Sequence, residues 1–425
     1  MRIAHFGTFD VENFGDLLFP LIFENRLGYA DLEVIHVSPV GGEGVFPDCR
    51  ASTSLEEALR SSFDAVVVGG GNIVHARTTA LGRYSADPSL VALGYAGLWL
   101  GASELAARLE VPLVWNAPGV PAAFGRETAP LVAWAAGACD HLAVRDERSA
   151  MWLRAAGFAG PVAVVPDTAV DVPRLWDEGA LREAFLEAFE SRGISSIPSR
   201  TVLVHLNARY ATDEAGVTAE RVARIARTLD ATPILCALGG CHGDADLAQR
   251  VASAMTCPVL LIDRPRSLRE IVACIAGSVA YVGSSLHGLI TACAFSRPAI
   301  LVARESRSGA AKFSGFLDQW DATAAPVIRS PSWVDAEALA GRLAGRAEDS
   351  RPQKRFAERW QIGGSLADRL HRHWSAVGEA LQLPRERRKS HRGGSRRALE
   401  RLLARDSGDR TLFQAVLDDQ RAGSG

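Results

Sequence analysis

The sequence predicts an α/β fold with two Rossmann-like domains, each built on a parallel sheet, followed by C-terminal helices. Three observations lead to this prediction. At 425 residues the chain is long enough for two core domains. Continuous apolar runs alternate with segments of helical spacing, which is typical of parallel sheets covered by helices on both faces. The order strand, glycine turn, helix occurs once in each half of the chain.

The first half carries this order between residues 64 and 120. DAVVVGGGN (64–72) is an apolar strand-like run that ends in glycines. GLWLGASELAARLE (97–110) has helical spacing and leads into the strand-like VPLVWNAPG. We therefore expect a first domain over residues 1–170.

The second half repeats the pattern after a charged boundary. Strand-like PVAVVPDTA (161–169) is followed by a charged helical stretch and then by the breaker-rich ISSIPS. TVLVHLNARY (201–210) opens a new series of strands, and SVAYVGSSLHG (278–288) again ends in a glycine and serine turn. We expect a second domain over 200–325, with a cleft between the two domains.

Two further segments complete the chain. Residues 326–383 have amphipathic helical spacing and are expected to return to the core. Residues 384–425 contain PRERRKSHRGGSRRALERLLAR, an arginine-rich tail. Such a tail is either a solvated, mobile terminus or a contact for an anionic membrane surface or partner, and the sequence leaves both open.

The composition excludes some kinds of binding. A net charge of -2 gives no general attraction to nucleic acid or to anionic lipid. All but three of the 47 basic residues are arginines, the lysines being Lys312, Lys354 and Lys389. Any side chain that holds a phosphate or carboxylate is therefore expected to be arginine or histidine.

The cysteines and the N-terminus suggest a cytoplasmic protein. The seven cysteines form no short CxxC pair, which fits a reducing compartment and argues against zinc. The start, MRIAHFGTFD, has no signal-peptide pattern, and no run reaches the ~18 apolar residues of a membrane span. We expect no metal and no transmembrane segment.

Polar residues gather where predicted strands end, the usual ligand-binding edge of open parallel sheets. After the strand RIAHF, the turn GTFDVENFGD (7–16) places Asn13, Gly15 and Asp16 before an apolar helix. Gly15 allows a close backbone approach. Asp16 either caps the helix or faces the cleft.

The glycine run at 69–72 is the second such turn. Gly70 and Gly71 permit close contacts that side chains forbid, and Asn72 follows them. The run is neither GxGxxG nor GxxxxGK[ST], so dinucleotide and P-loop sites lose support.

Two more strand ends carry charged residues. In AVRDERSAMWL (143–153), Arg145 begins either a capping and salt-bridge cluster or a functional site. In HLNAR (205–209), His205, Asn207 and Arg209 alternate and so share one strand face. CHGDAD (241–246) has metal-like residues at loose spacing and is interpreted as a solvated turn.

The turn GSSLHGL (283–289) places a histidine at the start of a predicted helix. His287 lies there beside Gly288, preceded by Ser284, Ser285 and Leu286. A helix N-terminus favours anions, and serine hydroxyls add donors.

Taken in order, these segments resemble the polysaccharide pyruvyl transferase family. The resemblance covers about residues 1–320 and depends on five motifs: the N-F-G-D turn, GGGN, R-D-E-R-S at 145–149, P-D-T at 166–168 and S-L-H-G at 285–288. It implies a two-domain fold like that of the GT-B glycosyltransferases, and we expect no cofactor. It also implies phosphoenolpyruvate as donor and a pair of sugar hydroxyls as acceptor, which receive pyruvate as a ketal on a cell-surface or extracellular polysaccharide or its precursor.

One position departs from the pattern of some members. They carry arginine immediately before Leu-His-Gly, where it is expected to hold the donor's anion, and this chain has Ser285. Arg145, Arg209, and Arg264 or Arg266 are the candidates to replace it.

The resemblance suggests roles for the site residues. Phosphoenolpyruvate carries close to three negative charges, so we expect His287, Ser284 and Ser285 to bind its phosphate. Protonation of the donor's methylene carbon and attack by a hydroxyl require an acid/base carboxylate. Asp16 is the first candidate and Asp167 the second.

Two other functions remain open on the sequence. A nucleotide-sugar glycosyltransferase of the same architecture would need an acidic residue for the ribose, for which Glu270 and Glu305 have no convincing setting. The second open function is that of a relative that binds sugars or anions without catalysis. The acceptor sugar, and whether it is lipid-linked, are not encoded in any of these motifs.

Overall fold

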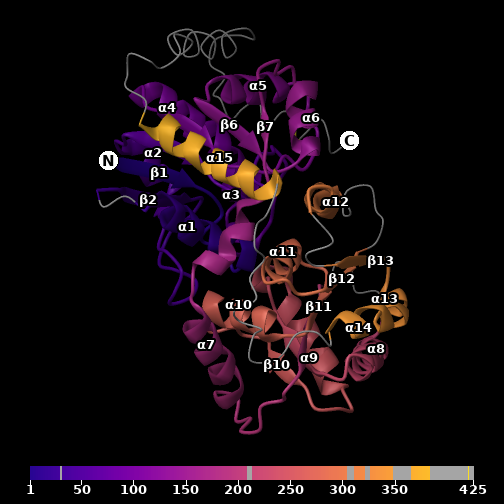
Figure 1. The fold of residues 1–425 in the computed structure, drawn as a ribbon. Coiled ribbons are helices and arrows are strands. Elements are labelled where there is room, and N and C mark those ends of the chain that lie inside the picture. Colours follow the sequence, from indigo (N-terminus) through magenta and orange to yellow (C-terminus); the bar gives the residue numbers. More distant parts are fainter. Residues whose placement is uncertain are drawn as a thin grey trace.

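The computed structural model describes residues 1–28, 31–207, 213–303, 311–320, 326–347, 365–382 and 420. Two parallel sheets form two lobes, the first drawn in indigo and purple and the second in pink and orange (Figure 1). The predicted fold class, two parallel-sheet α/β domains with C-terminal helices, is confirmed.

The first sheet has seven strands in the order β3-β2-β1-β4-β5-β6-β7, and every pair is parallel. Their bounds are Arg2–Phe6 (β1), Glu33–Ser38 (β2), Thr53–Ser54 (β3), Ala65–Val68 (β4), Leu113–Trp115 (β5), His141–Val144 (β6) and Ala163–Val164 (β7). All four residues of β4 are buried because helices cover both faces. β7 is shorter than predicted, since Pro161 and Pro166 flank it and cannot donate ladder hydrogen bonds.

Helices of the first lobe begin at recognisable caps. Ser54 and Glu57 form a capping box at α2, and Asp146 accepts from Ser149 N (2.7 Å) at α6. The bounds are Phe14–Leu27 (α1), Leu55–Arg60 (α2), Gly82–Ala86 (η1), Pro88–Ala96 (α3), Gly97–Gly101 (η2, a π turn), Ala102–Leu109 (α4), Ala129–Gly137 (α5), Glu147–Ala155 (α6) and Thr168–Arg174 (η3).

The segment from α3 to α4 is one continuous helix, Pro88–Leu109, of 22 residues. Among the described residues it alone is long and apolar enough to cross a membrane, and 67% of its most apolar window is buried within the protein. Leu98, Trp99 and Leu100 are inaccessible and pack in the core beside the first sheet. A core helix meets the same criteria as a span, so this feature is weak evidence for a membrane.

The second sheet has six parallel strands in the order β10-β9-β8-β11-β12-β13. Their bounds are Thr201–His205 (β8), Thr232–Cys236 (β9), Leu260–Ile262 (β10), Ala280–Gly283 (β11), Ala299–Val302 (β12) and Val327–Ser330 (β13). The sheet thus continues past residue 325, because β13 pairs with β12.

Helices of the second lobe surround this sheet. They are Glu178–Glu190 (α7), Ala215–Thr228 (α8), Gly240–His242 (η4), Asp244–Ser253 (α9), Leu268–Gly277 (α10), Leu286–Ala294 (α11), Ala311–Leu317 (α12), Trp333–Leu339 (α13) and Gly341–Ala347 (α14). Although α7 precedes β8 in sequence, it packs on α10 and so belongs with this lobe.

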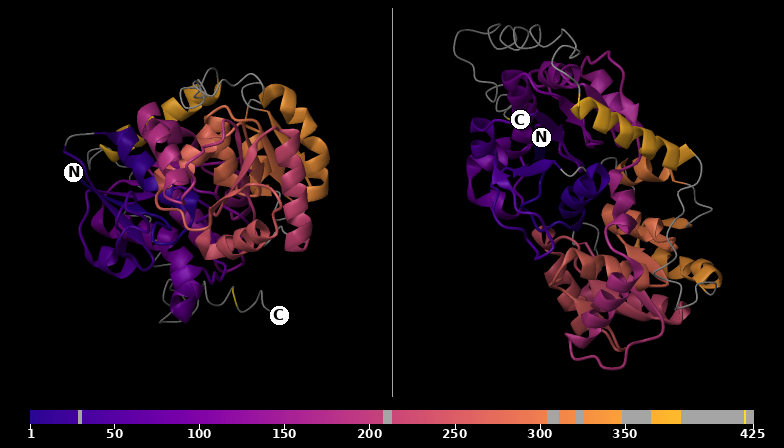
Figure 2. Two further views of the ribbon diagram at one scale, coloured as in Figure 1. Left: turned by 90° about the horizontal axis from the view of Figure 1, so that it is seen from below. Right: turned by 60° about the vertical axis from the view of Figure 1, so that its left-hand side comes forward.

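The helix Ser365–Leu381 (α15) contacts β5 and β6 of the first sheet. Figures 1 and 2 show it in yellow alongside the first lobe. Trp374 Nε1 donates to Asp171 Oδ2 (2.9 Å), and Arg26 Nε lies 3.1 Å from the same oxygen. The predicted arginine-rich tail, 384–425, lies outside the described residues except for Gln420.

Contacts between the lobes bring their strand ends together. Phe14 N, at the start of α1, donates to Leu238 O beyond β9 (2.8 Å). On another side, the carboxylate of Asp48 accepts from Leu268 N and Arg269 N, both at 2.9 Å. The segments that follow β1 and β9 therefore meet across the interface.

Candidate active site

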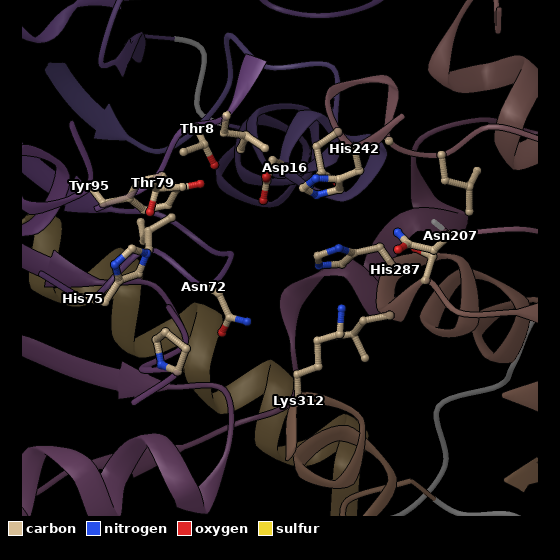
Figure 3. A pocket seen from close by; sticks show the side chains of 18 of the residues that line it. Thr8, Asp16, Asn72, His75, Thr79, Tyr95, Asn207, His242, His287 and Lys312 are labelled. Atoms are coloured by element: carbon tan, nitrogen blue, oxygen red, sulfur yellow. The ribbon is translucent and has the colours of Figure 1, made fainter. Parts of the chain in front are cut away.

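A cavity of about 360 Å³ lies between the lobes at the carboxyl ends of both sheets. Figure 3 shows Asp16, Asn72, His242, His287 and Lys312 directed toward its centre. The first lobe supplies the turns after β1, β4 and β6, and the second lobe supplies those after β8, β9 and β11 together with the start of α12. This is where ligands bind in open parallel sheets.

Asp16 lies in the first turn of α1 and faces the cavity. Asn13 occupies the N-cap position, which decides between the two roles that the sequence left open for Asp16. Burial raises the pKa of Asp16 to about 6, against the opposing effects of His287, a hydrogen bond from Thr8, and Arg145, while Asp167 adds to the rise. Asp16 can therefore carry a proton near neutral pH.

Asp167, at the start of η3, is buried as well but is ionised. Burial would raise its pKa, yet His287, Arg145 and the amide of Ala169 outweigh that effect and hold the pKa at about 2. Arg145 Nη1 donates to Asp167 Oδ2 at 3.0 Å. Opposite shifts in neighbouring carboxyl groups are typical of an acid and a permanent anion in one site.

Arg145 is fixed from several sides. Besides Asp167, it donates from Nη2 to Asn72 Oδ1 (2.6 Å), and its carbonyl accepts from Gln319 Nε2 (2.7 Å). Gly119 makes this possible, because a Cβ there would lie 2.7 Å from Arg145 Nε and closer still to Asn72. Asn72 of the GGGN turn thus orients the arginine of the R-D-E-R-S motif.

His287 reaches across from the second lobe to the first. A Cβ on Gly15 would collide with its imidazole, so the glycine of the N-F-G-D turn provides the space for this histidine. His287 Nε2 lies 3.7 Å from Asp167 Oδ2, which is ion-pair distance. Ser285 caps α11 by accepting from Gly288 N (3.2 Å), and its hydroxyl keeps a hydrogen to donate.

A second histidine, His205, is paired with a carboxylate that the sequence did not single out. His205 Nε2 lies 2.9 Å from Asp244 Oδ2, and both side chains are 1% exposed. The sequence predicts a solvated turn at 241–246, whereas Asp244 is buried at the start of α9 and lines the cavity with His242. The loose spacing concealed this, because the partner comes from another strand.

Lys312 is also missing from the sequence prediction. It lies in the first turn of α12 and lines the cavity, where Figure 3 shows its side chain extending toward His287 and Asn207. The available signal was its rarity, since it is one of three lysines in a chain otherwise using arginine.

The other predicted residues divide into two groups. Those that line the cavity are Asn13, Asn207, Ser284, Ser285 and Leu286. The glycines instead make room for neighbours: a Cβ on Gly71 would lie 2.9 Å from Asp16 Oδ1, one on Gly288 would lie 2.6 Å from Tyr281 Oη, and one on Gly70 would strike Phe19.

Of the remaining anion-clamp candidates, the two that the structure describes, Arg264 and Arg266, do not line this cavity. Arg209 lies outside the described residues. Arg264 and Arg266 are exposed, and Arg266 lines a different pocket beside Glu270. Glu270 itself pairs with Arg192 (2.6 Å), away from the central cavity.

Several buried polar atoms around the cavity have no hydrogen-bond partner among the described residues. They come from both lobes: Arg145 Nε, His205 Nδ1, Asp244 Oδ1, Ser284 Oγ and His287 Nε2. Buried polar atoms are normally paired with protein, water or ligand groups, so these five suit the cavity to a polar occupant.

Comparison with solved structures supports the fold. The UDP-GlcNAc 2-epimerase of Methanocaldococcus jannaschii aligns with a TM-score of 0.51 at 13% identity, over 88% of this chain and 99% of that one. A putative UDP-N-acetylglucosamine 2-epimerase from Listeria monocytogenes gives a TM-score of 0.51 at 13% identity, over 90% and 97% of the two chains. At such identity the likeness concerns the fold alone.

Comparison of the sequence decides the family. No curated protein matches the chain. The family model for polysaccharide pyruvyl transferases, however, matches residues 13–306, a span that contains Asp16, Arg145, Asp167 and His287. The chain therefore belongs to the polysaccharide pyruvyl transferase family.

Proposed function

We propose that this protein transfers pyruvate from phosphoenolpyruvate to two hydroxyls of one sugar in a cell-surface or extracellular polysaccharide or its precursor, forming a ketal and releasing phosphate. The observation that carries the proposal is the cavity's pairing of a protonatable carboxyl, Asp16, with the basic side chains of Arg145, His287 and Lys312.

The basic groups fit the donor. Phosphoenolpyruvate has a phosphate and a carboxylate, which need charge-assisted donors. Arg145 Nε and His287 Nε2 are buried without hydrogen-bond partners among the described residues, and Lys312 extends toward the same space (Figure 3). Arg145 and Lys312 together take the place of the arginine that Ser285 replaces.

The two carboxylates take different roles. Asp167, whose pKa is about 2, holds no proton at neutral pH and serves to orient Arg145. Asp16, with a pKa of about 6, is the acid and base of the reaction. A positioned group of this kind contributes about 10²–10⁴-fold to rate.

The steps balance without an outside proton. Protonated Asp16 gives its proton to the methylene carbon of the donor, and the first sugar hydroxyl attacks the adjacent carbon while returning its proton to Asp16. The carbon–oxygen bond to phosphate then breaks, with the electron pair leaving on phosphate. The second hydroxyl forms the last bond to this carbon, and its proton ends on the phosphate.

The cell compartment and the acceptor's form belong to the same proposal. We place the reaction in the cytoplasm, which fits the free cysteines of the described chain. The acceptor is a sugar unit, free or lipid-linked.

Phosphate release from phosphoenolpyruvate, with detection of the ketal by mass spectrometry, tests the proposal against a panel of sugar acceptors. Thermal-shift measurements separate it from the alternatives. Stabilisation by phosphoenolpyruvate supports the proposal, whereas stabilisation by UDP- or GDP-sugars and not by phosphoenolpyruvate supports a glycosyltransferase. Stabilisation by glycans alone supports a non-catalytic relative.

A further inference from the structure

One end of the cavity differs in chemistry from the rest. The segment after the GGGN turn and the helix α3 form a side arm lined by His75, Thr78, Thr79, Leu81 and Tyr95. Figure 3 shows His75, Thr79 and Tyr95 on the same side as Thr8 and across the cavity from His287 and Lys312. The side arm is thus separated from the basic groups by the space next to Asp16 and Asn72.

The side arm presents hydroxyl and apolar groups. Its one formal charge comes from Arg77, which is exposed. Leu81 and the ring of Tyr95 offer apolar surface, and Thr78 and Thr79 offer hydroxyls. A sugar ring has the complementary character, with C–H faces and hydroxyl edges, whereas phosphoenolpyruvate would find few charged donors here.

His75 has a defined hydrogen-bonding state. Its Nδ1 accepts from the backbone N–H of Arg77 at 3.2 Å. A backbone amide only donates, so the proton of the neutral ring must be on Nε2. Burial and the neighbouring Arg77 lower the pKa of His75 to about 4, which keeps the ring neutral at pH 7. Nε2–H has no partner among the described residues.

Several contacts hold His75 in place. Its ring stacks on Tyr95, with centroids 4.4 Å apart, and its carbonyl accepts from Trp99 Nε1 (3.0 Å). Trp99 lies in the π turn of the long helix, a feature frequent at functional sites. Gln420 donates to the carbonyl of Ala76, the residue after His75 (2.8 Å), and to that of Ala92 in α3 (2.7 Å). These two bonds connect the segment that carries His75 to α3.

We propose that the side arm binds the acceptor as a neutral sugar ring and that His75 Nε2–H donates a hydrogen bond to one of its hydroxyls. The inference rests on the proposed function and adds where the acceptor binds and that its ring carries no charge. It puts the donor between Arg145, His287 and Lys312, the sugar beside His75 and Tyr95, and Asp16 between them. Asp16 then reaches both the methylene carbon and the attacking hydroxyl.

The test compares His75→Phe with the wild type on methyl glycosides of galactose, glucose, mannose and N-acetylmannosamine. Phenylalanine keeps the stacking on Tyr95 and removes the donor. We expect the KM for glycoside to rise about three- to tenfold, the loss of one neutral hydrogen bond, with the Kd of phosphoenolpyruvate unchanged. His75→Gln, which returns an N–H donor, should recover most of the loss even if the phenylalanine variant folds poorly.

The controls separate this inference from the proposed function. His141→Phe alters a half-buried histidine outside the cavity and should change neither constant. Histidine ¹⁵N NMR gives a readout that needs no turnover, because the Nε2 signal of His75 should shift when glycoside is added. Unchanged glycoside KM in His75→Phe overturns the inference, as does an unmoved His75 signal. Failure of the wild type to bind phosphoenolpyruvate overturns the proposed function, and the inference with it.

Discussion

The turn after β1 and the turn after β7 each bury a carboxyl group at the same cavity, with opposite results. Asp16 is 8% exposed and Asp167 is 3% exposed, so burial alone would raise both pKa values. Asp167 has His287 Nε2 at 3.7 Å and a direct bond from Arg145, whereas Asp16 has one hydroxyl bond from Thr8 and the opposing charge of Asp167 nearby. The groups that contact each carboxyl group, more than its degree of burial, therefore decide which of the two can hold a proton near neutral pH.

Replacing Asp16 with asparagine should have the largest effect on turnover. The change keeps shape and removes the ionisable group, so we expect about 10²–10⁴-fold slower ketal formation with little change in phosphoenolpyruvate affinity. Steady-state phosphate release and calorimetry measure the two quantities. Unchanged turnover would show that another group moves the proton.

The same variant should be more stable than the wild type above pH 6. The pKa of Asp16 is about 6 when folded and about 4 when unfolded, so the folded state holds the proton more tightly. Ionisation of Asp16 therefore lowers the free energy of unfolding as pH rises from about 4 to 6, and this loss is complete above pH 6. Relative to the wild type, the free energy of unfolding of Asp16→Asn should be higher by on the order of 3 kcal/mol at pH 8 and almost equal at pH 4. Denaturant unfolding at the two pH values measures this difference.

Replacing Asp167 with asparagine should lower the free energy of unfolding at neutral pH. Removing one member of a buried ion pair costs about 3–5 kcal/mol, because Arg145 loses its closest carboxylate. The folded pKa of Asp167 is about 2, below the unfolded value, so its stabilisation is present above pH 4 and disappears as pH falls toward 2. Unfolding curves that show a gain in stability for this variant at pH 7 would contradict the comparison.

Gly15→Ala tests whether the two lobes must meet at this point. The new Cβ would displace His287, and a misplacement of about 1 Å can cost about 10²-fold in rate. Gly216→Ala is the matched control, since a Cβ there meets nothing within 4 Å. Equal turnover in both variants would mean that the position of His287 is not important.

His287→Ala should have the smallest effect of this series on the fold. Losing one charge-assisted hydrogen bond should weaken phosphoenolpyruvate binding about ten- to a hundredfold, or roughly 1.5–3 kcal/mol. Acceptor affinity and melting temperature should change little. A large fall in melting temperature would instead indicate a structural histidine.

The sequence predicted the fold well because strands and helices leave local periodic patterns. The apolar runs at 65–68 and 280–283 are strands followed by polar turns, as expected. Local patterns could not show that β13 would join the second sheet, since that depends on pairing with β12.

The site was predicted only in part, because sequence motifs reveal single residues but not the partners that the fold brings to them. Motif residues such as Asp16, Arg145 and His287 do lie around one cavity, but their roles stay predictions until tested. The contact of Gly15 with His287, the burial of Asp244 against His205 and the approach of Lys312 all arise from long-range packing. Nothing in the neighbouring sequence of these residues reveals such partners.

The most direct test of the central claim is a calorimetric titration of the wild-type protein with phosphoenolpyruvate, beside an identical titration with UDP-GlcNAc. Arg145, His287 and Lys312 lead us to expect saturable binding of phosphoenolpyruvate at one site per chain, weakened in His287→Ala, and no binding of the nucleotide sugar. Binding of UDP-GlcNAc without any binding of phosphoenolpyruvate would contradict the account.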